Sequence, residues 1–181
     1  MNKKLKLEDL NRLSVLEFKE VEKDAIIVLL DDVRSLNNIG SIFRTCDAMG
    51  IKKMYLCGIT GQPPHREIRK TAIGASESID WEYEKSASEI LTKYRNLGYE
   101  IIAVEQTSKS VSLENYHLRN KKILLVFGNE INGVSQKIID LCDLSLEIPQ
   151  WGTKHSINIS VSVGIVLWNL KKLFTKVESL K

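Results

Sequence analysis

Short apolar runs alternate with amphipathic segments along most of this chain, and the alternation predicts strands separated by helices. Unbroken runs of β-branched and other apolar residues are typical of parallel strands that are buried on both faces of a sheet. The segment SIDWEYE (78–84) alternates polar and apolar residues, as a strand does. The other predicted strands are AIIVLL (25–30), KKMYLCG (52–58), YEIIAVE (99–105), KKILLVFG (121–128) and LSLEIP (144–149).

Helical periodicity fills the segments between these runs. Residues 6–22 carry leucines and a valine at helical spacing among charges, which predicts an amphipathic leader helix. Residues 37–50 predict a helix with an asparagine N-cap, an apolar stripe and a closing glycine. Residues 86–98 predict a further helix with a capping box formed by Ser86 and Glu89. Shorter helices are expected within 59–75, after a Pro-Pro loop, and near 134–141.

Strands alternating with helices predict an α/β fold whose sheet is mostly parallel and flanked by helices. A chain of 181 residues with 43% hydrophobic composition is long enough for one well-packed domain. We therefore expect a helical extension at 1–24 and a single domain over 25–181. Ligands of parallel sheets gather beyond the carboxyl ends of the strands, although any strand must end in a polar loop. The polar residues at those ends are Asp31, Asp32, Glu105, Gln106, Thr107, Asn129, Glu130 and the segment 150–158.

Composition narrows the class of protein only slightly. The formal net charge of +3 and a pI near 8.7 permit a polyanionic partner without requiring one. The three cysteines are an odd set without paired spacing, so the sequence favours a reducing, cytoplasmic compartment over a disulfide framework. The charged amino-terminal segment lacks the apolar core of a secretory signal, and no stretch approaches the roughly 20 apolar residues of a membrane span.

Missing motifs exclude several kinds of chemistry. The loop after Phe127 contains Gly128 and Gly133 but lacks the Lys-Ser/Thr of a phosphate-binding P-loop, and neither a G-x-G-x-x-G nor a G-x-S-x-G pattern occurs. The three histidines are far apart and share no ligand spacing with the cysteines, so no metal site is expected. What remains is a site rich in amides and backbone groups, which suits a ligand that brings its own reactivity.

Three segments, in order and with matching spacing, resemble the motifs of the SpoU/TrmH family of RNA ribose methyltransferases. They are NNIGSIFRTCDAMGI (37–51), LLVFGNEINGVS (124–135) and IPQWGTKHSINISVSVGI (148–165), and the resemblance extends over about residues 25–175. It implies an α/β fold with a deep trefoil knot in its carboxyl-terminal part, a homodimer, and S-adenosylmethionine as the methyl donor. It also implies methylation of a ribose 2′-hydroxyl in tRNA or rRNA.

The third of these segments carries two conflicting patterns. Polar and apolar residues alternate through INISVSVGI (157–165), and a period of two indicates a strand. The family has a helix there. Ser156, Ser160 and Gly164, spaced by four, would give that helix a small-residue face for close packing. We follow the resemblance and expect a helix.

The resemblance implies catalytic roles for the residues that match its motifs. Asn38 and Arg44 match the asparagine and arginine of the first motif, and Glu130 matches the acid of the second. Ser156 and Asn158 match the serine and asparagine of the third. From the residues alone, Asn38 and Glu130 could simply cap helices, and Arg44 could be a solvated charge. Because arginine stays protonated in proteins, we expect Arg44 to orient the hydroxyl or a phosphate and to stabilise negative charge, not to act as a base.

The resemblance also implies a donor site made of loops and backbone. In the second motif, Gly128 would let the backbone approach the ligand, and the carboxylate of Glu130 would favour a positively charged sulfonium. Ile148 and Ile157 match apolar positions around the adenine, although core packing could also explain them. The residues expected to bind the donor are Gln106, Gly128, Asn129, Glu130, Ile148, Ile157 and Ser162.

RNA contacts are expected on a basic surface, although each basic cluster could equally be a solvated face. The best candidate is PPHREIRK, whose Pro-Pro turn presents a group of basic residues beside the first-motif helix: His65, Arg66, Arg69 and Lys70. We expect tRNA in preference to rRNA as the substrate. Two other functions stay open, namely an RNA-binding module of the same fold without activity and an unrelated small-molecule α/β enzyme with an unknotted sheet.

Overall fold

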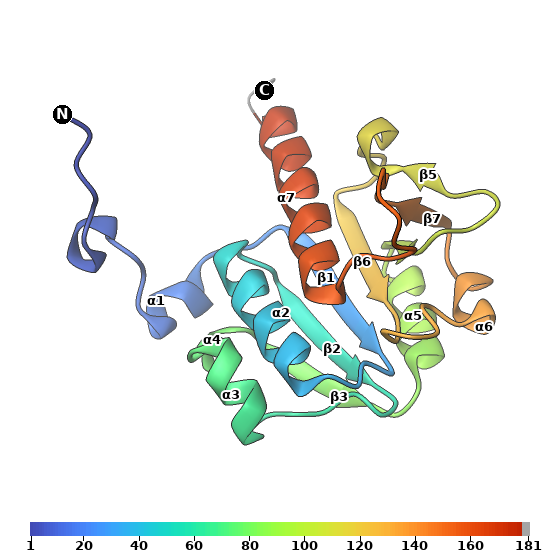
Figure 1. Cartoon of the computed structure of the whole chain (residues 1–181), viewed down its shortest axis with the longest axis horizontal. Helices are drawn as coiled ribbons and strands as arrows, with labels where there is room; N and C mark the ends of the chain where they lie inside the picture. Colours follow the sequence, from blue (N-terminus) through green and yellow to red (C-terminus); the bar gives the residue numbers. More distant parts are fainter. Residues whose placement is uncertain (179–181) are drawn as a thin grey trace.

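The fold is built on a parallel sheet. The computed structural model describes residues 1–178, and its strands lie in the order β3-β2-β1-β6-β4-β7-β5, with every pair parallel (Figure 1). The strands are β1 (Ala25–Asp31), β2 (Lys53–Cys57), β3 (Trp81–Glu84), β4 (Glu100–Val104), β5 (Val111–Ser112), β6 (Lys122–Phe127) and β7 (Leu144–Glu147). The predicted α/β class with a mostly parallel sheet is confirmed.

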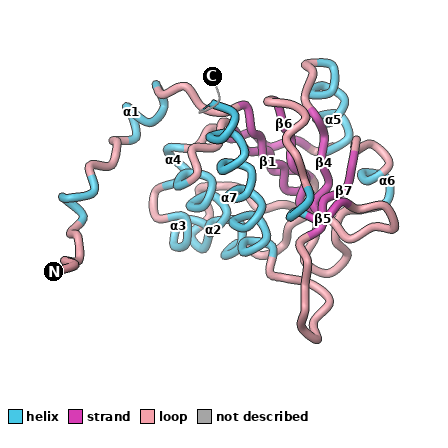
Figure 2. Tube along the Cα trace, turned by 90° about the horizontal axis from the view of Figure 1, so that it is seen from above, coloured by secondary structure: helices cyan, strands magenta, loops and turns pink. Residues whose placement is uncertain are grey.

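Helices cover both faces of this sheet (Figure 2). On one face pack α2 (Leu36–Ala48), α3 (Arg66–Ala72), α4 (Ala75–Ser78) and α7 (Ile159–Glu178), and on the other α5 (Ala87–Asn96) and α6 (Gln136–Ile139). Before β1 lies α1 (Val15–Glu20), and 3₁₀ turns lie at Leu7–Leu10 and Leu113–Asn115. Within residues 1–178, none of the helices is both long enough and apolar enough to cross a membrane.

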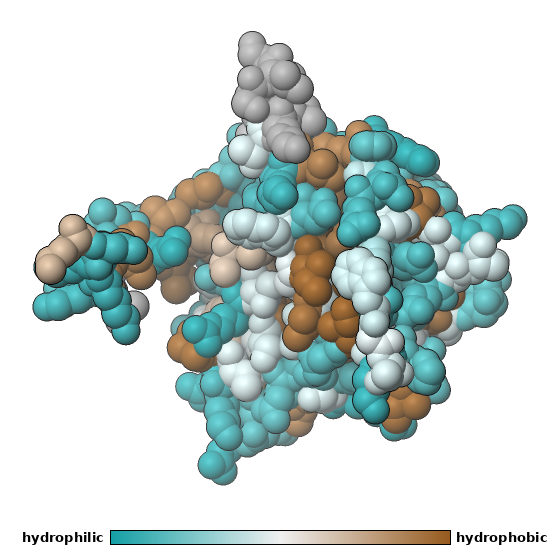
Figure 3. All heavy atoms as spheres, turned by 45° about the horizontal axis from the view of Figure 1, so that its top comes forward, coloured by the Kyte–Doolittle hydropathy of each residue, from teal (hydrophilic) through white to brown (hydrophobic). Residues whose placement is uncertain are grey.

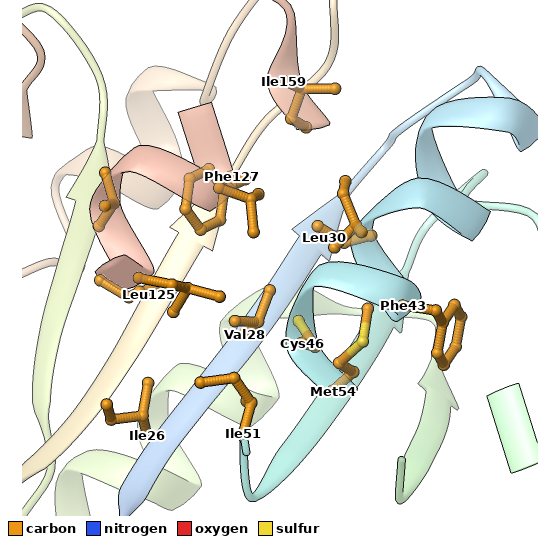
Figure 4. Packing of buried hydrophobic residues seen from close by; sticks show 14 of the residues in the cluster. Ile26, Val28, Leu30, Phe43, Cys46, Ile51, Met54, Leu125, Phe127 and Ile159 are labelled. Carbon is orange, nitrogen blue, oxygen red and sulfur yellow. The ribbon is translucent and has the colours of Figure 1, made fainter. Parts of the chain in front are cut away.

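Strand β1 lies at the centre of the core, and burial on both faces explains its unbroken apolar sequence. Ile26, Val28 and Leu30 point to the face covered by α2 and α7 (Figure 4). Ile27 and Leu29 point to the face covered by α5. All of these side chains are at most 1% exposed. Burying an aliphatic side chain of this size stabilises a fold by roughly 1.5–3 kcal/mol, so β1 determines which elements meet at the middle of the sheet.

The amino-terminal segment is helical only in short pieces, so the single leader helix predicted over 6–22 is wrong. The 3₁₀ turn ends at Asn11, which has a left-handed backbone with φ 46°, and α1 begins separately after Ser14. The capping box of α1 is complete, since Ser14 Oγ accepts the Glu17 N–H at 3.3 Å and Glu17 Oε2 accepts the Ser14 N–H at 2.8 Å. Local capping therefore divides a segment in which the leucine spacing continues.

A phenylalanine anchors this extension. Phe18 is partly buried against the core, with Lys23 Nζ lying 4.6 Å from the centre of its ring. An ion pair between Asp24 and Lys171 of α7 holds the end of the segment. Four of the side chains that suggested an amphipathic helix are instead exposed: Leu10 38%, Leu13 54%, Leu16 78% and Val21 48%. The boundary between an extension at 1–24 and a domain from 25 stays a prediction.

Two predicted helix caps are also wrong. Helix α2 is capped by Ser35, whose Oγ accepts the Asn38 N–H at 3.3 Å, and not by an asparagine. Helix α5 receives no side-chain cap from Ser86, because the Ser86 hydroxyl pairs with Ser88 Oγ at 2.8 Å. Several short polar side chains compete at each helix start, and the direction in which the chain enters decides among them.

Helix α7 confirms the helix expected for residues 157–165. Val163 and Leu167 are fully buried, whereas Val161, Ile165 and Trp168 are 50%, 37% and 61% exposed. Apolar side chains therefore lie on two sides of this helix, one in the core and one at the surface. That double set produces the alternation that resembles a strand.

The small-residue face predicted for this helix makes no close contact. Ser156 lies before the first residue of α7, and a Cβ added at Gly164 would meet only a side-chain carbon of α2, at an ordinary 3.9 Å. The close approach lies instead at Gly40 of α2, where a Cβ would fall 2.4 Å from the Ile68 carbonyl oxygen and 2.0 Å from Thr71 Oγ1. Helices α2 and α3 therefore touch with no room for a side chain between them.

We expect Gly40→Ala to destabilise the protein, because the added methyl group cannot fit unless the backbone of α3 moves. Overpacking of this kind costs about 1–3 kcal/mol, which urea unfolding followed by circular dichroism would record as a lower midpoint. Gly164→Ala is the matched control in α7. That site has room, and alanine is favoured over glycine inside helices by about 0.5–1 kcal/mol, so its midpoint should stay or rise. A Gly40→Ala midpoint at or above that of the wild type would contradict this packing.

Candidate functional site

A cavity of about 600 Å³ opens at the carboxyl ends of β4, β6 and β7. Its walls come from residues 104–106, the loop 127–133, much of the segment 146–159, and Ser162 of α7. Parallel sheets bind their ligands at this edge, and the volume is that of a site for a cofactor-sized molecule. The residues expected to bind the donor all line it: Gln106, Gly128, Asn129, Glu130, Ile148, Ile157 and Ser162. Of the expected catalytic residues, Ser156 and Asn158 line it as well as Glu130.

The loop after β6 is a tight turn that depends on two glycines. Asn129 and Gly133 exchange backbone hydrogen bonds at 3.0 and 2.8 Å, and Gly133 has a left-handed backbone with φ 64°. A Cβ at Gly128 would fall 2.2 Å from the Gly133 carbonyl. The side chain of Asn129 completes the turn, since its Oδ1 accepts two N–H groups within it and its Nδ2 donates to the Asp32 carbonyl at 2.8 Å. Gly128 and Asn129 therefore shape the wall that they line.

The carboxylate of Glu130 caps the amino terminus of α2. Its Oε2 accepts the Arg34 N–H at 2.9 Å, while its Oε1 accepts the Ser35 N–H at 2.9 Å and Asn38 Nδ2 at 3.1 Å. Burial by itself would raise the pKa of Glu130, but these hydrogen bonds outweigh it and hold the pKa below its usual value. The helix-capping interpretation left open by the sequence is thus the observed arrangement, reached from a distant part of the chain.

Asn38 connects this carboxylate to the third motif segment. Its Nδ2 donates to Glu130, and its Oδ1 accepts Asn158 Nδ2 at 3.1 Å. Asn158 Oδ1 in turn accepts the N–H of Ser160 at 2.9 Å and its hydroxyl at 2.7 Å, next to the start of α7. One hydrogen-bond network therefore joins the three segments that carry the predicted motifs.

Arg44 stands apart from this network. It lies on the exposed side of α2, roughly one and a half turns beyond Asn38, and does not line the cavity. None of the ion pairs formed within residues 1–178 involves it, so its guanidinium is available to an incoming anion. The structure brings Asn38, Glu130 and Asn158 together and leaves Arg44 outside.

Acidic side chains dominate the charge of the cavity. Glu105, Glu130 and Glu147 line it, and no lysine or arginine is among its described lining residues. A cavity with this balance favours a ligand that carries positive charge. Within residues 1–178, no three histidine, cysteine, aspartate or glutamate side chains gather as metal ligands would.

No motif singles out Glu105 or Glu147. Glu105 appears among the polar strand ends, and that position is the signal that points to it. Glu147 lies inside the predicted strand LSLEIP, where alternation hides it, and its Oε2 accepts the Ser110 hydroxyl at 2.8 Å. His155 also lines the cavity, and its carbonyl accepts Gln106 Nε2 at 2.9 Å.

A second cavity, of about 620 Å³, adjoins the first and is more apolar. The two share lining residues, among them Ile148 and Ile157. The second is also lined by the loop 149–154, by Ile165 and Asn169 of α7, and by residues 113–114. Trp151 in that loop is 86% exposed. Large apolar side chains gathered at a surface indicate contact with another molecule.

The predicted basic cluster lies on and just before α3, outside both cavities. Arg66, Arg69 and Lys70 are exposed. His65 is exposed as well, but its Nδ1 accepts the Glu67 N–H at 3.2 Å and so caps the helix. Because α3 packs against α2, these cations lie on the same side of the sheet as Arg44.

Comparison with known proteins gives consistent matches. The model of the SpoU rRNA Methylase family matches residues 25–168. The chain is 30% identical over 162 residues to a tRNA (guanosine(18)-2′-O)-methyltransferase of Aquifex aeolicus (strain VF5), a match covering 86% of this chain and 73% of that protein.

Two solved structures have a closely similar fold. The A. aeolicus TrmH/SpoU tRNA modifying enzyme matches with a TM-score of 0.81 at 28% identity, covering 91% of this chain and 82% of that one. An AdoMet-bound rRNA methyltransferase from Sinorhizobium meliloti matches with a TM-score of 0.76 at 25% identity, covering 86% of this chain and 59% of that one.

We expect Glu130→Gln to lower stability by about 1 kcal/mol, since an amide brings a single acceptor oxygen and no charge to the start of α2. The folded-state pKa of Glu130 is lowered, so its contribution is complete above the ordinary pKa of 4.5 and is lost as pH falls through the lowered value. The difference in unfolding free energy between wild type and variant should therefore be largest near neutral pH and shrink below about pH 4.5.

Urea unfolding at about pH 7 and about pH 3.5 measures this difference. Glu22→Gln is the matched control, because Glu22 is an exposed residue that lies outside the helices and strands, and it should leave both values unchanged. An effect of Glu130→Gln that is the same at both pH values would count against the capping role.

Proposed function

Since the chain belongs to the SpoU rRNA Methylase family, we infer that it is an RNA 2′-O-methyltransferase with S-adenosylmethionine as its methyl donor. The observation that carries this proposal is the network in which Glu130, Asn38 and Asn158 join the three motif segments beside a cavity of about 600 Å³. Two of the similar proteins are named for tRNA and one for rRNA, so tRNA is the substrate that we favour.

The cavity suits S-adenosylmethionine in size and in charge. When bound, this donor supplies an electrophilic methyl group on a sulfonium cation, which Glu105, Glu130 and Glu147 would favour electrostatically. The turn at 128–133 offers backbone groups to polar atoms, and Ile148 offers an apolar wall to the adenine. We assign donor binding to Gln106, Gly128, Asn129, Glu130, Ile148, Ile157 and Ser162.

The residues around the network would orient the acceptor. We assign to Arg44 the binding of the ribose hydroxyl or a neighbouring phosphate and the stabilisation of developing negative charge, because its guanidinium is charged, exposed and unpaired by the described carboxylates. Asn38 and Asn158 position the helices α2 and α7 around the site, and Ser156 lies exposed at its edge. Besides its part in donor binding, Glu130 would place Asn38 and the start of α2, since its oxygens accept N–H groups from Asn38 and from the residues that precede the helix.

RNA would approach over the helices α2 and α3. We assign phosphate contacts to the exposed cations Arg66, Arg69 and Lys70 on that side of the sheet, together with Arg44, and to the exposed imidazole of His65. These residues lie outside the donor cavity, which leaves the cavity to the methyl donor. The three cysteines are free thiols, which suits a reducing compartment, and we place the protein in the cytoplasm.

We also propose that the carboxyl-terminal part of the chain forms the trefoil knot of the family. Strand β7 pairs with β4 on one side and β5 on the other. The chain then crosses back over the sheet, and α7 packs against α2, the helix that follows β1. In the proposed knot, the segment between β7 and α7 would thread past the loops at 105–106 and 127–133, with which it lines the cavity.

A further part of the proposal is that two copies of the chain pair through α7. Val161, Ile165 and Trp168 follow one another at helical spacing on its exposed side. Trp151 extends this apolar surface, since it lines the same cavity as Ile165. Figure 3 shows apolar atoms gathered near the middle of one face of the molecule. A twofold pairing would bury such a surface against its own copy.

The activity is tested by incubating the purified protein with S-adenosylmethionine and unmodified tRNA or rRNA, followed by mass spectrometry of the nucleosides. We expect one 2′-O-methylated nucleoside from tRNA. Arg44→Ala should lower kcat by at least about 100-fold, while the Kd for S-adenosylhomocysteine from calorimetry stays within about twofold, because Arg44 lies outside the cavity. Lys137→Ala is the control, because Lys137 is an exposed cation of α6, on the face of the sheet opposite to α2. It should change neither kcat nor Kd.

Each alternative gives a different result in this experiment. Donor binding without methyl incorporation would favour the inactive RNA-binding module, and an absence of donor binding would favour an unrelated enzyme. Arg44→Lys examines the role of the arginine. A lysine variant that keeps activity with a new, lower titration in its pH–rate profile would assign the proton transfer to this position and contradict charge stabilisation.

The pairing through α7 is tested by Trp168→Asp. We expect the wild type to have twice the chain mass of 20.6 kDa in sedimentation velocity, and the variant to have the mass of one chain, because a carboxylate cannot be buried unpaired in the interface. Leu97→Asp is the matched control, since Leu97 is a 52% exposed residue at the end of α5, and it should leave the dimer intact. A wild type that sediments as one chain at micromolar concentration would refute the pairing.

A further inference from the structure

Glu105 makes an unusual set of contacts at the end of β4. It is the first residue after the strand, it is half-buried, and it lines the cavity. Its Oε2 accepts the N–H of Val134 at 2.8 Å, and its Oε1 accepts the N–H of Gln106 at 2.9 Å. Both oxygens are therefore bound to backbone N–H groups, one on its own strand end and one on the loop after β6.

The loop after β6 lies directly on this carboxylate. A Cβ built on Gly133 would fall 2.1 Å from Glu105 Oε2, so the contact exists only because residue 133 has no side chain. Gly133 also pairs with Asn129 and contacts Gly128, which forms part of the cavity wall. Through Val134 and Gly133, Glu105 thus supports the turn that lines the cavity.

The same strand end also reaches the opposite wall. Gln106 Nε2 donates to the carbonyl of His155 at 2.9 Å, and His155 belongs to the loop between β7 and α7. Two neighbouring residues just after β4, Glu105 and Gln106, therefore hold the two loops between which the cavity opens. Glu105 accepts its hydrogen bond with a carboxylate, and hydrogen bonds to an ionised acceptor are roughly twice as strong as neutral ones, such as the bond from Gln106 to a carbonyl.

We propose that Glu105 is a positioning residue for the methyl donor, which keeps the loop 128–134 in its binding shape through Val134 and Gly133, with Gln106 holding the facing loop. The inference rests on the function proposed above. Glu105→Ala removes both acceptor oxygens and leaves the N–H of Val134 without its partner. Val134 is only 5% exposed, so little water can replace the lost acceptor. Glu105→Gln keeps one acceptor oxygen and so retains one of the two bonds.

Calorimetry with S-adenosylhomocysteine and amide hydrogen exchange on the full chain test this proposal. We expect Glu105→Ala to raise the Kd at least about tenfold, because the loss of one hydrogen bond to a buried N–H changes a binding constant by about tenfold. Glu105→Gln should raise the Kd less, since it retains one of the two bonds. The kcat at saturating donor should stay within about twofold, since the residue acts on donor binding. In the ligand-free variant the Val134 amide should exchange at least about tenfold faster, whereas that of Leu125 in β6 should keep its rate.

The controls separate this proposal from a general loss of stability and from the proposed function. Glu89→Ala, an exposed glutamate of α5, should change neither Kd nor exchange. A Glu105→Ala variant that binds as tightly as the wild type would overturn the positioning role and leave the methyltransferase assignment standing. Equal acceleration of exchange at Val134 and Leu125 would also overturn it, since the defect would then be global. A wild type that fails to bind S-adenosylhomocysteine would refute the donor site itself, and this inference with it.

Discussion

A carboxylate at the start of a helix holds the parts of this site together. The first N–H groups of any helix lack partners within it, and their dipoles favour an anion. At α2 this anion is Glu130, which comes from the loop after β6. Because β1 and β6 are neighbours in the sheet, the loop that leaves one strand reaches the helix that follows the other. The position of α2, of Asn38 and, through Asn158, of α7 then follows from hydrogen bonds of ordinary length.

The same principle, a charged acceptor that satisfies backbone N–H groups, recurs on the other side of the loop. Glu130 ties its centre to α2, and Glu105 ties its end to β4. Between them the turn closes on itself, which requires the absence of a side chain at Gly128 and Gly133. A cavity wall made of backbone is held in this way by charges that also favour a cationic ligand. Arg44 of α2, the cations of α3 and the exposed apolar side chains Val161, Ile165 and Trp168 of α7 lie outside the cavity, where other molecules can reach them.

Most of the fold follows from patterns that can be read along the chain. The apolar run of β1 predicts a strand buried on both faces, and the structure places it between β2 and β6. Patterns fail where two local preferences compete. The leucines of 6–22 keep a helical spacing, yet the capping box at Ser14 starts a separate helix. In α7 the alternation of polar and apolar residues indicates a strand, because the helix is apolar on a buried side and on an exposed side.

The sequence by itself determined the class of fold and the edge of the sheet at which the cavity lies, since burial and strand ends leave a periodic record in the chain. The resemblance to known motifs added several of the residues that line the cavity, but not Glu147 or His155. It also contained both interpretations of Glu130, as a ligand contact and as a helix cap. The tertiary structure decided that this carboxylate caps α2, that Arg44 lies outside the cavity, and that Glu105 supports the loop. The reason is physical: each of these depends on where a backbone N–H or a side chain from a distant segment comes to lie, and no local spacing records that position.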